Sequence, residues 1–146
     1  MGIVLYTQVL PVVPVAQPRQ RMAVIGGHAH NYASAKHPIT DYKAQVRLMV
    51  SEEMRKRGVE PFTGGLILWV EFYLPRPKRL LTKKSPDGPI PHLSKPDLDN
   101  LIKGTKDSLK GVLWNDDSQV YGYDDCYKWY CEKGGQPRAE VTLIHK

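Results

Sequence analysis

The chain has 146 residues, which is enough for one ordinary domain with a buried core. Hydrophobic residues make up 41% and charged residues 25% of it, a composition that excludes an intrinsically disordered chain, and no apolar run is long enough to cross a bilayer. Lysine and arginine (21) outnumber aspartate and glutamate (15), and the resulting net charge of +6 favours a polyanionic partner such as nucleic acid.

The first expected element is a strand over residues 3–15 that ends in proline-rich irregular chain. This opening lacks a basic start and a small-residue cleavage site, and prolines interrupt it, so it does not resemble a signal peptide. We therefore expect a cytoplasmic protein. The basic residues Arg19 and Arg21 follow the strand, and residues 26–31 have the glycine, histidine and asparagine content of a loop.

The next expected element is a helix that begins near Pro38 and ends at Gly58, with Thr40 as its N-cap. Apolar residues recur along it at helical spacing, at Tyr42, Val46, Met49, Val50 and Met54. Lys43 and Arg47 lie four residues apart, and we expect both on the outer face of the helix. This helix is predicted to support the fold rather than to form a site.

Residues 66–74, LILWVEFYL, are aliphatic and aromatic throughout, which is typical of a central strand covered on both faces. The segment 75–96 that follows contains six prolines, which exclude regular secondary structure, and irregular connections of this length are usually functional or disordered. Most of the surplus positive charge lies here, because the segment carries only Asp87 against Arg76, Lys78, Arg79, Lys83, Lys84 and Lys95. The charge alone fits a phosphate-binding loop and a merely solvated loop equally well.

A second helix is expected over residues 98–110, and Gly111 ends it. Strands are expected over residues 120–131 and 140–144. The pattern contains no internal repeat and no second domain. The expected fold is therefore a single α+β domain over residues 1–146, with a small mixed β-sheet flanked by two main helices.

Two aspartates, Asp97 and Asp99, stand one residue apart at the start of the second helix. In a helix their side chains would lie about 200° apart, whereas in extended chain they point the same way. Pro96 favours an extended approach, so both carboxylates are expected to reach one point, although one of them could simply cap the helix. Lys103 is one helical turn after Asp99. Its ammonium group either forms a weak ion pair with Asp99, worth about 0.3–0.5 kcal/mol, or lies beside a phosphate bound at the acids.

A second acidic pair, Asp116 and Asp117, follows the apolar residues GVLW. Adjacent side chains on an extended strand face opposite sides, so only one of the two is expected to join Asp97 and Asp99. Alone, NDDS is only a turn signal. Combined with the first pair, it supplies a third oxygen ligand for Mg²⁺, an ion that binds through a few carboxylates and through phosphate oxygens.

Residues 95–120, KPDLDNLIKGTKDSLKGVLWNDDSQV, resemble the signature of the RusA-like Holliday-junction resolvases, small bacterial and phage endonucleases that cut four-way DNA junctions. This signature combines DLDN, a lysine, an aspartate and a leucine on one helix, a small apolar patch and DDxQV. The resemblance implies that Asp97, Asp99 and Asp117 are the catalytic, metal-binding acids and that Lys103 is the active-site lysine. It also implies a homodimer that uses Mg²⁺. The segment 75–96 is longer than the corresponding connection in the family.

The predicted activity is Mg²⁺-dependent phosphodiester hydrolysis that resolves four-way junctions in DNA recombination and repair, without an organic cofactor or a membrane partner. The residues expected to contact DNA phosphates are Arg19, Arg21, Arg76, Lys78, Arg79, Lys83 and Lys84. Two alternatives stay open. One is the same chemistry on flaps, splayed arms or RNA, and the other is a non-catalytic nucleic-acid-binding module whose acids only cap a helix and form a solvated turn.

Overall fold

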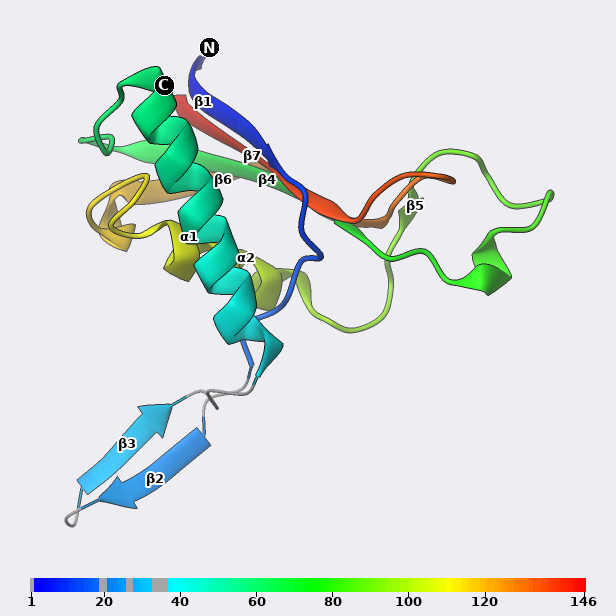
Figure 1. The fold of residues 1–146 in the computed structure, drawn as a ribbon, viewed down its shortest axis with the longest axis horizontal. Helices are drawn as coiled ribbons and strands as arrows, with labels where there is room; N and C mark the ends of the chain where they lie inside the picture. Colours follow the sequence, from blue (N-terminus) through cyan, green and yellow to red (C-terminus); the bar gives the residue numbers. More distant parts are fainter. Residues whose placement is uncertain (1, 19–20, 26–27, 33–36) are drawn as a thin grey trace.

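The computed structural model describes residues 2–18, 21–25, 28–32 and 37–146, and of 21–25 and 28–32 it describes only the backbone. Figure 1 shows a five-stranded sheet with the strand order β1-β7-β4-β6-β5. In that order the strands are β1 (Ile3–Leu10), β7 (Arg138–His145), β4 (Leu66–Leu74), β6 (Val120–Tyr130) and β5 (Ile90–Pro91). β4 pairs in parallel with β6 and antiparallel with β7, so the sheet is mixed and the predicted α+β class is confirmed.

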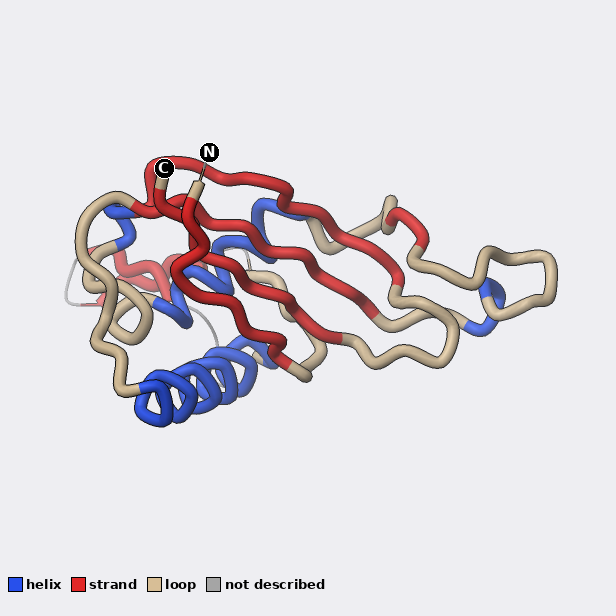
Figure 2. Tube along the Cα trace, turned by 90° about the horizontal axis from the view of Figure 1, so that it is seen from above, coloured by secondary structure: helices blue, strands red, loops and turns tan. Residues whose placement is uncertain are grey.

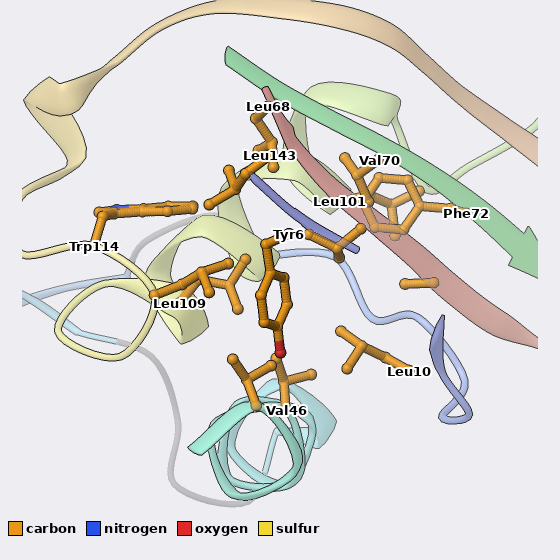
Figure 3. Close-up of a cluster of buried hydrophobic side chains, with 14 of the residues drawn as sticks. Tyr6, Leu10, Val46, Leu68, Val70, Phe72, Leu101, Leu109, Trp114 and Leu143 are labelled. Carbon is orange, nitrogen blue, oxygen red and sulfur yellow. The ribbon is translucent and has the colours of Figure 1, made fainter. Parts of the chain in front are cut away.

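The central strand β4 carries the core of the fold. Alternate side chains of β4 are fully buried on the side of the helices, namely Leu66, Leu68, Val70 and Phe72. Figure 3 shows the core side chains filling the space between the sheet and α1 (Pro38–Arg57). The prediction of a central strand is confirmed. Its other face is less completely covered than expected, because Trp69 and Glu71 are only half-buried.

Helix α1 begins three residues earlier than the predicted cap implies. His37 is the N-cap, and its imidazole Nδ1 accepts a hydrogen bond from the backbone N–H of Ile39 at 3.0 Å. Thr40 therefore lies inside the first turn, and the prediction that it caps the helix is wrong. The cause is Pro38, whose fixed φ suits the first helical position and whose missing N–H needs no partner there. The end at Gly58, with φ 65°, is as predicted.

The prediction that Lys43 and Arg47 occupy a free outer face of α1 is wrong, because the second helix, α2 (Leu98–Leu109), packs beside them. The Arg47 guanidinium donates hydrogen bonds to the carbonyl oxygens of Ser108, at 3.2 Å, and Lys110, at 2.8 Å. Lys43 lies 3.6 Å from a carboxylate oxygen of Asp107. These contacts satisfy carbonyls at the end of α2 and hold the two helices together.

The face of α2 that packs into the protein consists of Leu101, Gly104, Thr105, Ser108 and Leu109. The buried hydroxyls of Thr105 and Tyr42 share a hydrogen bond of 2.8 Å between the two helices. Burial raises the pKa of Tyr42 to about 12, so this hydroxyl stays protonated. α2 ends just before Gly111, as predicted, and φ of 81° at this position favours glycine.

Gly104 allows the chain that follows β1 to cross α2 at close range. A Cβ atom at this position would lie 3.1 Å from the carbonyl oxygen of Val15 and 3.2 Å from the backbone nitrogen of Gln17. The Gln17 N–H donates to the carbonyl oxygen of Asn100 at 2.9 Å. Gln17, two residues before Arg19, is therefore fixed beside the first turn of α2.

A two-stranded antiparallel sheet, β2 (Arg21–Ile25) and β3 (His28–Tyr32), stands apart from the main sheet in Figure 1. The prediction of a loop over residues 26–31 is wrong for residues 28–31, which belong to β3. The remaining two residues of that loop, and Arg19, lie outside the described residues. Within the described part of the chain, no helix is both long enough and apolar enough to cross a membrane.

Candidate active site

The solvent side of α2 lines a cavity of about 290 Å³. Asp99, Lys103 and Lys106 follow one another at spacings of four and three residues, so their side chains lie on one side of the helix. Asp117 and Tyr123 line the same cavity, Asp117 from the turn before β6 and Tyr123 from β6 itself. The structure therefore brings three predicted site residues, Asp99, Lys103 and Asp117, to one cavity.

Asp117 is aimed by a buried tryptophan. It begins η2 (Asp117–Gln119), a single 3₁₀ turn, and is half-buried. The indole N–H of Trp114 donates to its Oδ1 at 2.8 Å, and the Trp114 ring is fully buried. Because the donor cannot move within the core, one carboxylate oxygen is fixed and the other is left for a ligand.

The neighbouring acid, Asp116, has a structural role. Its carboxylate accepts the backbone N–H of Ser118 at 3.0 Å, and this hydrogen bond lowers the pKa of the Asp116 carboxyl. The Gln119 side-chain carbonyl accepts the backbone N–H of Asp116, and its amide group donates to the carbonyls of Phe62 and Gly64. This capping box fixes the turn. Asp116 therefore shapes the turn, and Asp117 lines the cavity.

Asp97 occupies the N-cap position of α2 in extended conformation, with φ −72° and ψ 146°. Its carboxylate makes no capping hydrogen bond, so the alternative that this acid simply caps the helix does not describe it. Asp97 lines a second, neighbouring cavity together with Lys95 and Asn100. The expected extended conformation holds for Asp97 but not for Asp99, which lies in the first helical turn.

The three predicted metal ligands consequently do not converge on one point. In the ranges that the structure describes, no three histidine, cysteine, aspartate or glutamate side chains lie close enough together to hold a metal ion. Asp99 and Asp117 share one cavity, and Asp97 faces the next. The change of backbone conformation explains the separation, because Asp97 precedes the helix in extended chain while Asp99 lies in its first turn, and the two side chains do not follow the alternation of a strand.

The cations of the cavity differ in their partners. Lys103 makes neither an ion pair nor a hydrogen bond within the described residues, so its ammonium group is open to a ligand. The Lys106 ammonium donates to the Tyr123 hydroxyl at 3.0 Å, and Asp107 is held by Lys43 of α1. Sequence reasoning did not select Lys106 or Tyr123. The helical spacing from Asp99 could have indicated Lys106, but only strand pairing places Tyr123.

The chain that leads into Asp97 is held by a lysine of β6. The Lys128 ammonium donates to the carbonyl oxygens of Ser94, at 2.6 Å, and Pro96, at 2.7 Å. His92 packs on Tyr130 with 4.5 Å between the ring centroids. Burial, assisted by the charge of Lys128, lowers the pKa of His92, so the neutral imidazole is favoured at this position.

Comparison with known proteins assigns the chain to a family. The family described as Endodeoxyribonuclease RusA matches residues 11–144. The chain belongs to the RusA endodeoxyribonuclease family. It is accordingly a hydrolase that acts on the phosphodiester bonds of DNA, of the Holliday-junction resolvase kind. It is also 33% identical over 135 residues to Uncharacterized protein YqaN of Bacillus subtilis (strain 168), and the match covers 89% of each chain.

In this RusA-family enzyme, hydrogen bonds hold the basic segment 75–96 in a defined conformation. Arg76, predicted as a DNA contact, instead donates all its described hydrogen bonds to backbone carbonyls of neighbouring residues. The other predicted contacts of this segment are exposed, namely Lys78, Arg79, Lys83 and Lys84. The side chain of Arg21 is not among those that the structure describes.

Proposed function

We propose that this enzyme resolves four-way DNA junctions as a homodimer, with Mg²⁺ as its cofactor. The observation that carries the proposal is the shared cavity of Asp99, Asp117 and Lys103 in a chain of the RusA family. Two carboxylates beside an ammonium group that has no partner among the described residues form a site that suits a divalent cation and a phosphate together.

The residues of the cavity fit a hard divalent ion. Mg²⁺ is typically held by one or two carboxylates and completes its shell with water and substrate phosphate oxygens, and Asp99 and Asp117 supply two carboxylates to one cavity. Asp97 lines the neighbouring cavity and makes no capping bond, and we propose it as a third ligand that reaches the ion only after its side chain turns toward the shared cavity. When bound, the ion lowers the pKa of a coordinated water and stabilises charge on the phosphate.

The side chains of the enzyme then have separate roles. Trp114 holds one carboxylate oxygen of Asp117 in place. The other oxygen of Asp117 is thereby oriented toward the cavity before the ion binds. Lys103 neutralises charge on the scissile phosphate from the helix face that it shares with Asp99. Exposed cations contact the remaining DNA phosphates and position the substrate without reading its sequence. For this role we propose Arg19, Arg21, Lys78, Arg79, Lys83 and Lys84.

A homodimer is proposed from the symmetry of the substrate. Resolution of a four-way junction requires two strands to be cut at equivalent positions. A two-fold dimer presents two identical sites in that arrangement.

The test is incubation of the enzyme with an end-labelled synthetic four-way junction, with and without Mg²⁺, next to flap, splayed-arm, linear duplex and RNA substrates. The expected result is paired, symmetric cuts in the junction that require Mg²⁺. The Asp97→Asn variant should bind the junction at least as tightly as the wild type, because a negative charge near phosphate is lost, but should not cut it. If flaps or splayed arms are cut in preference to the junction, they are the substrate instead. If the enzyme binds the junction but cuts no substrate with any divalent ion, the proposed catalysis is contradicted.

A further inference from the structure

Residues 76–88 form a projection that we call the arm, and Arg76 holds it together from inside. The Arg76 guanidinium donates to the carbonyl oxygens of Leu80 at 2.8 Å, Pro86 at 2.6 Å and Gly88 at 2.9 Å. These three acceptors span the arm from its first turn to its last residue. One side chain therefore closes a segment that no strand ladder closes among the described residues.

Lys133, in the turn after β6, fixes the arm from outside. Its ammonium donates to the carbonyl oxygens of Thr82 at 2.8 Å and Ser85 at 2.9 Å, and lies 3.3 Å from a carboxylate oxygen of Asp87. Its backbone N–H also donates to the Asp87 carbonyl oxygen at 3.0 Å. The arm is thus tied to the body of the protein at several points along its length, and its shape does not depend on a partner.

The cations at the surface of the arm are free of such bonds. Lys78, Lys83 and Lys84 are exposed and form no ion pair or hydrogen bond among the described residues, and Arg79 reaches only the Tyr130 hydroxyl, at 3.5 Å. The one acid of the arm, Asp87, is next to Lys133. The arm therefore presents four positive charges, and its one acid, although exposed, lies 3.3 Å from Lys133, a pattern that matches a row of phosphates.

The arm projects away from α2, the helix that carries Asp99 and Lys103. Figure 1 shows the arm projecting beyond the sheet and away from α2, and Figure 2 shows the same projection from above. A cation on the arm stands away from the helix that faces the scissile phosphate. It can touch another part of the same DNA molecule.

We propose that the arm is a preformed binding element for the phosphate backbone of a second duplex, distinct from the duplex that is cut, and that it favours branched over linear DNA. This inference rests on the proposed function, because a four-way junction supplies that second duplex beside the first. It assigns two roles to the basic residues in and beside the arm. Arg76 and Lys133 keep the arm in shape, while Lys78, Arg79, Lys83 and Lys84 bind.

The binding test compares the wild type with Lys83→Gln/Lys84→Gln, using fluorescence anisotropy on a four-way junction and on a linear duplex without Mg²⁺. The matched control is Arg55→Gln/Lys56→Gln, which removes two exposed charges from the end of α1. The arm variant should weaken junction binding about tenfold and lower its salt dependence by about two counterions, while duplex binding changes less than about threefold. The control should change both affinities equally and by less than about threefold.

The order of the arm is tested separately by limited trypsin digestion. The wild type should resist cleavage after Lys83 and Lys84, and Arg76→Met should be cut there about tenfold faster, because local opening governs such cleavage. Lys133→Met should behave in the same way and serves if Arg76→Met fails to fold. Equal cleavage of wild type and both variants would show that the arm is not preformed.

Three binding results would overturn the inference. These are unchanged junction affinity in the arm variant, equal losses on junction and duplex, and a loss of the dimer in sedimentation, which would make the arm a contact between two copies of the chain. The measurements need no cutting. If the wild type binds the junction but cuts nothing, the proposed catalysis fails while the arm is still tested.

Discussion

The active-site cavity and the arm use the same kinds of charged residue in opposite ways. In the cavity, Asp99 and Lys103 stand on a regular helix and point their charges at an open space. The arm contains hardly any regular structure, and Arg76 within it and Lys133 in the turn after β6 both direct their charges onto its backbone carbonyls. The backbone groups of a helix hydrogen-bond to one another, which leaves the side chains free for a ligand. In an irregular segment, side chains must supply the hydrogen bonds that the backbone groups lack.

The comparison shows that a count of positive charges does not measure a binding surface. Arg76 and Lys83 belong to one basic segment, yet the Arg76 guanidinium donates its hydrogen bonds to backbone carbonyls, whereas the Lys83 side chain is exposed to solvent. The same division appears between the adjacent acids Asp116 and Asp117. In each pair, a substitution should reveal which member acts on the substrate.

The largest expected effect comes from the adjacent acids. Asp117→Asn should reduce junction cleavage about a thousandfold while junction binding is retained, because a charged ligand of the cavity is lost. Asp116→Asn is the matched control, since an asparagine oxygen can still accept the Ser118 N–H, and its cleavage rate should stay within about threefold of the wild type. Equal losses in the two variants, measured in single-turnover cleavage, would place the catalytic role on the turn as a whole.

The two lysines of the cavity should differ next. Lys103→Met should lower single-turnover cleavage about a hundredfold, because the Lys103 ammonium group is proposed to neutralise phosphate charge. Lys106→Met should lower it less than about tenfold, since the Lys106 ammonium already donates to Tyr123. The reverse order of the two losses would transfer the phosphate role to the Lys106–Tyr123 pair.

Trp114→Phe sharpens the role of the buried donor behind Asp117. It keeps an aromatic ring in the core but removes the N–H, and cleavage should fall about tenfold, as expected when a ligand loses its orienting partner. Trp69→Phe, on the other side of the sheet, should leave the rate unchanged. The free energy of unfolding in urea shows whether a slower Trp114→Phe enzyme is merely less stable, which would remove the positioning role.

The smallest effect concerns His92, beside the chain that leads into Asp97. Its pKa is lowered by burial, so the unfolded chain takes up a proton more readily than the folded protein does. The contribution of neutral His92 to stability is therefore present above the ordinary histidine pKa of 6.5 and is lost as the pH falls below it. Urea unfolding at about pH 8 and about pH 5 should show a smaller stability loss for His92→Gln than for the wild type or for His145→Gln, an exposed control.

Sequence reasoning was most successful where a pattern is local. The run at residues 66–74 predicted the central strand, and the glycines at 58 and 111 marked the ends of both helices, because these signals depend on the residue itself and its neighbours. The capping residue of α1 was missed, since a proline one position later already suits the helix start.

The arrangement of the site depended on contacts between distant segments, and these were harder to predict. The pattern predicted that one of the two adjacent acids approaches the helix of Asp99, but only the resemblance to a family selected Asp117. The placement of Tyr123 requires the parallel pairing of β4 with β6. The Arg76 side chain points into the arm because it donates to three carbonyl oxygens that only the folded arm brings together. No periodicity in the sequence records such contacts.

The most direct test of the account is whether Asp99 and Asp117 hold the same ion. Isothermal titration of the DNA-free enzyme with Mg²⁺ should be compared among the wild type, Asp99→Asn, Asp117→Asn and the double variant. A shared ion predicts that either single substitution abolishes most of the binding and that the double variant loses little more, since the effects of two ligands of one ion are not additive. Wild-type Mg²⁺ affinity in both single variants would contradict the account.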